Sequence, residues 1–164
     1  MAMVKCSSKR KSQRLSQSSV QSRYDQFSWP EATFCPTCGA LYLNGRWTWQ
    51  KRDSHQHQSQ CPACQRTQEN QPAGQIELRG KFLKVHHHEI INLILTTEET
   101  EKAAHPLERI MSISDQDDTV VIRTTGIHMA CRIGKALSRS YKGDYDFQYG
   151  DHEQFILVSW KREL

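Results

Sequence analysis

The 164-residue sequence lacks any run of about 18 consecutive apolar residues, so it offers no candidate for a membrane-spanning helix. It also lacks an apolar stretch after its basic N-terminal residues, so we expect no secretory signal and a cytoplasmic location. Hydrophobic residues make up 37% of the chain. That fraction and length suit one ordinary domain, or a small module beside a domain of about 90 residues.

Catalytic signatures are also missing. The sequence has no Gly-x-Ser-x-Gly elbow, no His-Glu-x-x-His motif and no glycine-rich nucleotide-binding pattern. No set of acid, base and nucleophile stands out. We therefore expect a protein that is not an enzyme and has no small-molecule substrate.

Acidic residues are absent before Asp25, where serine and Lys/Arg dominate. Such a composition buries too little apolar area to offset its ordering entropy, so residues 1–33 are predicted to form a disordered basic tail. A basic arm can follow phosphates along a nucleic acid, or simply keep the chain in solution.

Four of the six cysteines form two Cys-x-x-Cys pairs, which are 22 residues apart. In a reducing compartment this pattern favours a metal over disulfides. Four thiolates suit tetrahedral Zn²⁺, with iron–sulfur ligation as the alternative. They leave no open position for activated water, so the expected zinc is structural. The predicted ligands are Cys35, Cys38, Cys61 and Cys64.

Residues 34–66 are predicted to form the zinc knuckle or ribbon module, followed by a linker at 67–74. A module of about 30 residues needs such a metal because it cannot build a sufficient core. His55 and His57 lie in a polar segment and could replace a cysteine, but we interpret them as bystanders. Cys6 and Cys131 are interpreted as incidental.

Residues 41–49 predict a β-hairpin around Asn44-Gly45, because this pair suits positive φ at both turn positions. Trp47 and Trp49 would share one side of the second strand. They either stack on unpaired bases or cap the small core, and we favour the core for at least one of them. The candidate RNA-contacting residues here are Arg46, Trp47, Trp49, Lys51 and Arg52.

The rest of the chain, residues 75–164, alternates strand and helix patterns. We predict helices at 86–104 and 127–141, and strands at 75–80, 107–114, 119–125, 144–149 and 154–160. This order predicts an α+β, split-βαβ (ferredoxin-like) two-layer sandwich with two helices over one face of the sheet.

The second predicted helix carries a basic stripe. No acid occurs between Thr119 and Gly143, and the basic residues recur at spacings of three and four. A stripe of one sign resembles a phosphate-contacting surface, although a plain solvated face is the alternative. The candidate RNA-contacting residues of this helix are His128, Arg132, Lys135, Arg139 and Lys142.

Several segments resemble a bacterial family related to the zinc-binding N-terminal region of the Nmd-type (nonsense-mediated decay protein three) export adapters, which bind the large ribosomal subunit. These segments are FCPTCGALYLNGRW, CPACQR, HHHEIINLI, AHPLERIMSI and TGIHMACRIGKAL, and the resemblance spans roughly residues 34–160. It implies a ribosome-linked role, with the four cysteines in the zinc positions.

Together these patterns predict a zinc-stabilised protein that binds ribosomal RNA or a ribosomal subunit, as an assembly, hibernation or quality-control factor. The alternative is a protein-interaction or regulatory adapter that uses its sheet to bind a partner and does not bind RNA.

Overall fold

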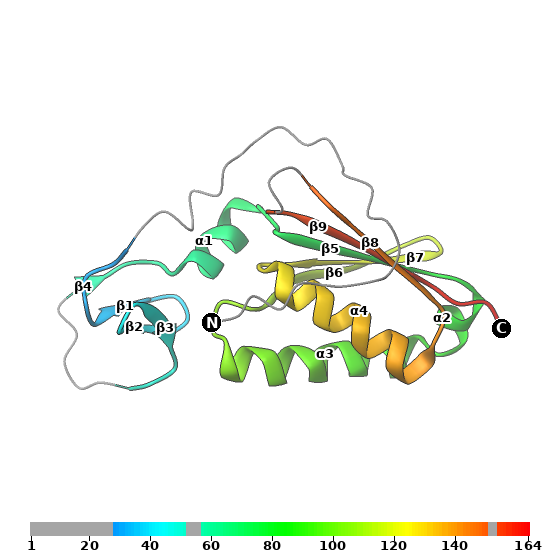
Figure 1. The fold of residues 1–164 in the computed structure, drawn as a ribbon, viewed down its shortest axis with the longest axis horizontal. Helices are drawn as coiled ribbons and strands as arrows, with labels where there is room; N and C mark the ends of the chain where they lie inside the picture. The colour runs from blue at the N-terminus through cyan, green and yellow to red at the C-terminus, as the bar shows by residue number, and fades with distance from the viewer. Residues whose placement is uncertain (1–27, 52–56, 151–153) are drawn as a thin grey trace.

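The computed structural model describes residues 28–51, 57–150 and 154–164. The predicted basic tail up to residue 27, together with Arg52 and His55, lies outside the described residues. The described chain forms two parts, which lie side by side in Figure 1. We call residues 28–51 and 57–70 the N-terminal module, and residues 73–150 and 154–164 the C-terminal domain.

The N-terminal module contains a small sheet of strand order β3-β2-β1-β4. Asn44 and Gly45 have φ values of 52° and 79°, so the predicted hairpin turn is confirmed. The strands are β1 (Thr33–Phe34), β2 (Leu41–Leu43), β3 (Arg46–Thr48) and β4 (His57–Gln58).

Helix α1 (Pro62–Glu69) completes the module, and it was not predicted from the sequence. The predicted linker, residues 67–74, begins inside this helix and ends at the first residue of the next strand. Pro62 at the first helical position and the side chain of Cys61 as cap start the helix, and Asn70 ends it in the left-handed conformation. The helix is mostly polar, so it lacks the periodic apolar residues from which a helix is predicted.

The C-terminal domain follows the predicted order of elements, with one short helix added. Helix α4 has the predicted bounds, and α2 precedes the long helix α3. The elements are β5 (Gly74–Arg79), α2 (Lys81–Val85), α3 (His87–Ala104), β6 (Ile110–Gln116), β7 (Thr119–Thr124), α4 (Ile127–Tyr141), β8 (Asp144–Tyr149) and β9 (Ile156–Lys161).

The five strands have the order β6-β7-β5-β9-β8. Strand β7 is antiparallel to both β5 and β6, so β5 and β6 run parallel around α3. Strand β9 is parallel to β5 and antiparallel to β8, so β7 and β8 run parallel around α4. Two split βαβ units therefore interlock in a mixed α+β domain. The fifth strand, β9, separates β5 from β8, and the ferredoxin-like arrangement is not confirmed.

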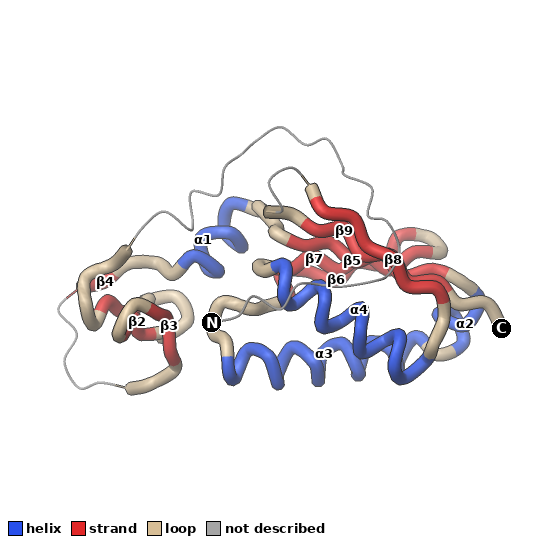
Figure 2. The backbone as a smooth tube through the Cα atoms, viewed as in Figure 1, coloured by secondary structure: helices blue, strands red, loops and turns tan. Residues whose placement is uncertain are grey.

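Helices α3 and α4 cover one face of this sheet (Figures 1 and 2). Alternate residues of β5 and β9 join the helices in one buried core. The fully buried members include Ile76, Leu78, Ile90, Ile94, Ile133, Leu137, Ile156 and Val158. The intervening residues of β5, among them Glu77 and Arg79, lie on the opposite face, which no described helix covers.

The Leu137→Ala substitution tests the packing of α4 on the sheet. Leu137 is 0% exposed, so we expect its truncation to lower the free energy of unfolding by about 2–5 kcal/mol. Leu95 of α3 is 43% exposed, and Leu95→Ala is the matched control, with an expected cost below about 1 kcal/mol. Urea denaturation followed by circular dichroism measures both, and equal costs would contradict the packing described.

Candidate functional site

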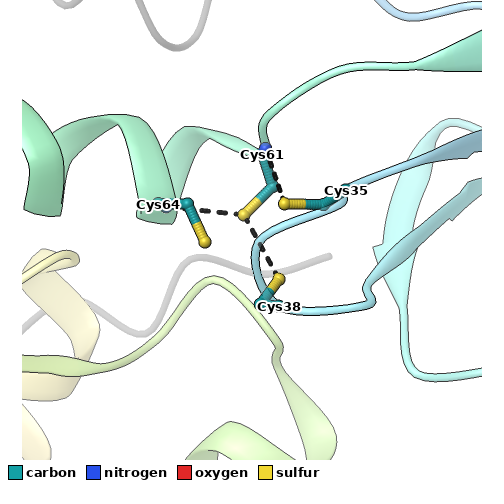
Figure 3. Close-up of side chains that lie close together, drawn as sticks. All are labelled: Cys35, Cys38, Cys61 and Cys64. Carbon is teal, nitrogen blue, oxygen red and sulfur yellow. Dashed lines mark hydrogen bonds between the residues drawn. The ribbon is translucent and has the colours of Figure 1, made fainter.

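The four predicted ligands come together at one end of the N-terminal module. Cys35 follows β1, Cys38 lies in the turn after it, and Cys61 and Cys64 lie at the start of α1 (Figure 3). Their sulfur atoms all lie within 4.8 Å of one another. The Cys38 and Cys61 sulfurs are 3.7 Å apart. A tetrahedral zinc ion with Zn–S bonds of about 2.3 Å would separate its sulfurs by about 3.8 Å, so the cluster is compatible with one metal ion.

Backbone amides hold these sulfurs in place. The N–H of Cys61 donates to the sulfur of Cys35 at 3.3 Å, and the N–H of Cys64 donates to that of Cys61 at 3.4 Å. Gly39, with a φ of 84°, turns the chain after Cys38 so that its N–H bonds the carbonyl of Cys35 at 2.9 Å. The two N–H···S hydrogen bonds stabilise the thiolate form of Cys35 and Cys61 and thus favour metal binding.

Burial opposes the ionisation that metal binding would require of these cysteines. Burial raises the pKa of Cys61 and of Cys64, and the charge of Cys38 adds to both effects. Burial also opposes ionisation of Cys35, but backbone hydrogen bonds, above all from Cys61, outweigh it and lower its pKa to about 7. Four thiolates in this space therefore need positive charge. A divalent ion on four sulfurs would supply it and would have no open position for catalysis.

Arg109 brings positive charge to the same sulfurs from the C-terminal domain. Its Nη1 lies 3.1 Å from the sulfur of Cys64, and its Nη2 lies 3.1 Å from that of Cys38 and 3.5 Å from that of Cys61. Burial opposes the charged guanidinium, but the bonds to Cys64 and Cys38 prevail and raise the pKa of Arg109. Sequence reasoning missed Arg109, because a lone arginine 45 residues from Cys64 fits no ligand spacing.

Three further contacts join the module to the domain near Arg109. The indole N–H of Trp49 donates to the carbonyl of Lys102 in the last turn of α3 at 2.6 Å. The Arg109 guanidinium carbon lies 5.6 Å from the centre of the Trp49 ring, within the range of a cation–π contact. Leu107 packs against the buried cluster that contains the cysteines. The candidate metal centre thus lies at the contact between the two parts.

Trp47 belongs to the core of the N-terminal module, the role that the sequence favoured for at least one tryptophan. It is 6% exposed and packs edge-on against Trp29 at a ring distance of 5.3 Å. This burial leaves no face of Trp47 for a nucleic-acid base. Arg46 and Lys51 are exposed, whereas the half-buried Trp49 contacts the C-terminal domain.

Tertiary packing divides the basic stripe of α4 into two halves. Glu101 of α3 accepts from His128 at 3.0 Å and pairs with Arg132 at 3.1 Å. The sequence near α4 showed no acid, but the packing of α3 against α4 supplies one. Lys135 and Arg139 have no acidic partner among the described residues. Lys142 is exposed at the end of the helix.

A groove of about 200 Å³ runs between α3 and α4 beside these free cations. One wall is formed by α4 with its basic residues, and the other by threonines of α3. The lining residues are Thr96, Thr97, Thr100, Glu101, Arg132, Lys135, Ala136 and Arg139.

Glu108 fixes the start of α4. Its carboxylate accepts the backbone N–H of Met129 at 2.9 Å, so it caps the helix from outside. Burial raises the pKa of this carboxyl, although the Met129 bond and nearby His128 oppose the rise. A Cβ at Gly126 would lie 2.1 Å from the carboxylate, so only glycine permits this approach. Glu108 therefore positions α4 while its neighbour Arg109 contacts the thiolates.

Comparisons of the chain with family models, with curated proteins and with solved structures find no match. Within the described part of the chain, each helix is too short or too polar to cross a lipid bilayer.

We expect the purified protein to contain one zinc ion per chain. Structural zinc contributes about 10–16 kcal/mol in small zinc-binding peptides, so chelation should unfold the N-terminal module. Plasma mass spectrometry measures the metal, and Cys61→Ser should remove it. Cys131 is buried in α4 outside the cluster, so Cys131→Ala is the control that keeps it. Full zinc content in Cys61→Ser, or wild-type content well below one, would disprove the site.

Arg109→Gln should weaken zinc binding by about 10–100-fold, because it removes the N–H groups that neutralise three sulfurs. Arg109→Lys keeps the charge but cannot span two sulfurs, so we expect an intermediate affinity. Competition with a chromophoric chelator measures both variants. Arg123→Gln, on the uncovered face of the sheet, should match the wild type. An unchanged affinity in Arg109→Gln would argue against the role given to Arg109.

Proposed function

We propose that this protein is a non-enzymatic, zinc-stabilised RNA-binding protein and that α4 is its principal contact with RNA. The proposal is supported by basic residues of α4 that have no acidic partner among the described residues. Lys135 and Arg139 line an open groove without an acidic partner among the described residues, whereas Glu101 compensates the neighbouring Arg132. Unpaired cations beside a groove are suited to phosphates, which dominate the affinity of nucleic-acid binding.

The four thiolates support a structural rather than a catalytic zinc ion. Zinc in a closed four-cysteine shell gives folding energy and no reactive water. Its place beside Arg109 and Trp49 would fix the N-terminal module on the C-terminal domain. The exposed Arg46 and Lys51 of the module would then add to the positive surface. We also propose that the C-terminal domain is a variant of the ferredoxin-like fold with one added strand, β9, and its two split βαβ units support this proposal.

Ribosomal RNA, in the ribosome or in one of its subunits, is the RNA that we propose. The net charge of +4 supports contact with a polyanion. The relation of the cysteine and helix segments to ribosomal export adapters is itself part of the proposal, since no comparison with known proteins finds a match. An assembly, hibernation or quality-control factor in the cytoplasm would meet this RNA.

A protein-interaction adapter is the second candidate, favoured by the uncovered face of the five-stranded sheet. Glu77 pairs with Arg79 at 2.9 Å and accepts from Gln75 at 3.1 Å. Arg123 lies opposite Gln75 in the sheet register. This face carries both signs of charge, which suits a protein partner better than a phosphate chain.

Binding of a fluorescent single-stranded RNA should weaken steeply with salt and depend on α4. Each phosphate contact adds about 0.7 to the slope of log affinity against log salt for single strands. Lys135→Gln/Arg139→Gln should therefore reduce the slope by about 1.4 and lower the affinity. Fluorescence anisotropy between low and moderate salt measures both quantities.

Arg79→Gln/Arg123→Gln is the matched control, because it removes two positive charges from the uncovered sheet face. It should leave RNA binding near the wild-type level. If the sheet face binds a protein, this variant should weaken the binding of that protein only. Co-sedimentation with ribosomal particles should likewise be reduced in Lys135→Gln/Arg139→Gln and unchanged in Arg79→Gln/Arg123→Gln. Salt-insensitive binding, or equal loss in both double variants, would refute the role of α4.

A further inference from the structure

We infer that the groove between α3 and α4 reads the ribose 2′-hydroxyl, so that the protein prefers RNA to DNA of the same sequence. This inference rests on the proposed function and adds a specificity to it. It assigns separate tasks to the two walls of the groove, with phosphate held by α4 and the sugar hydroxyl by two threonines of α3.

The two helices run antiparallel across the groove. Glu101, near the end of α3, contacts His128 and Arg132 near the start of α4. Thr100 and Thr96 precede Glu101 on α3, and Lys135 and Arg139 follow Arg132 on α4. In the antiparallel arrangement these two pairs lie opposite each other, and all four residues line the groove. Thr96 and Thr100 are exposed and one helical turn apart, so both lie on the groove side of α3.

The threonine hydroxyls can accept but not donate a further hydrogen bond. Thr96 donates its proton to the carbonyl of Asn92 at 2.8 Å, and Thr100 donates to that of Thr96 at 3.1 Å. A hydroxyl has one proton and two lone pairs, so each oxygen keeps a free acceptor position. Glu101 also lines this wall, with its oxygens engaged by His128 and Arg132. The α3 wall therefore offers acceptors alone.

The donors on α4 and the acceptors on α3 together determine which kind of ligand can bind both walls of the groove. A phosphate has only acceptor oxygens, so it finds no free donor on Thr96 or Thr100 in this arrangement and would bind on the side of Lys135 and Arg139. A ligand that fills both sides needs an anionic group and a nearby hydroxyl donor. The ribose–phosphate backbone has both, since the 2′-hydroxyl can donate while the adjacent phosphate accepts. Deoxyribose has no such donor, so DNA would leave the threonine oxygens unused.

Matched oligonucleotides test the inference. Fluorescence anisotropy compares an RNA strand with a DNA strand of identical sequence that contains deoxyuridine in place of thymidine. We expect RNA to bind roughly tenfold more tightly, as for two modest hydrogen bonds. Thr96→Val/Thr100→Val keeps the side-chain shape but removes the acceptors, so it should bind RNA as weakly as DNA. Thr96→Ser/Thr100→Ser keeps the oxygens and should retain the preference.

Each outcome separates this inference from the proposed function. Equal binding of RNA and DNA by the wild type, with the expected salt dependence, would overturn the 2′-hydroxyl inference and leave nucleic-acid binding in place. A preference that persists in the valine variant would also overturn it, since the hydroxyl would be read elsewhere. Binding of neither strand would refute both proposals. Thermal melting confirms that the exposed threonine variants are folded.

Discussion

Hydrogen bonds from the guanidinium of Arg109 to the cysteine sulfurs are the interaction on which the arrangement of the two parts depends. Buried thiolates repel one another and need positive charge, and a buried guanidinium needs acceptors. A divalent ion inside the cluster, with Arg109 beside it, would satisfy both needs. The preceding residue, Glu108, caps α4 through the N–H of Met129. Two adjacent residues thus link the candidate metal centre to the helix that carries the basic groove.

The same packing decides which charges of α4 remain available. Because α4 lies antiparallel to α3, Glu101 reaches His128 and Arg132 but leaves Lys135 and Arg139 without an acidic partner among the described residues. The positive charge without an acidic partner among the described residues is consequently concentrated in the second half of the helix, where RNA binding is proposed. Thr96 and Thr100 of α3 face these two cations, while Glu101 lines the groove beside Arg132. The groove is therefore asymmetric, with donors on one wall and acceptors on the other.

Features set by neighbouring residues were predictable from the sequence. The spacing of Cys35, Cys38, Cys61 and Cys64, the Asn44-Gly45 turn and the apolar period of α4 all depend on local chemistry. Arg109 and Glu101 could not be found this way, because their partners lie 45 and 27 residues away in the chain. Helix α1 was missed because its caps, Cys61 and Asn70, define it rather than an apolar stripe. The position of β9 beside β5 depends on pairing between the two ends of the domain.

Hydrogen–deuterium exchange with and without a zinc chelator tests whether the metal centre holds the two parts together. Metal removal should raise amide exchange in residues 33–48 and also in residues 105–110, because Arg109 loses its ordered partners. Strands β5, β7 and β9 should remain protected, since their core contains no cysteine ligand. Unchanged exchange in residues 105–110 after complete metal removal would contradict the link between the metal centre and the C-terminal domain.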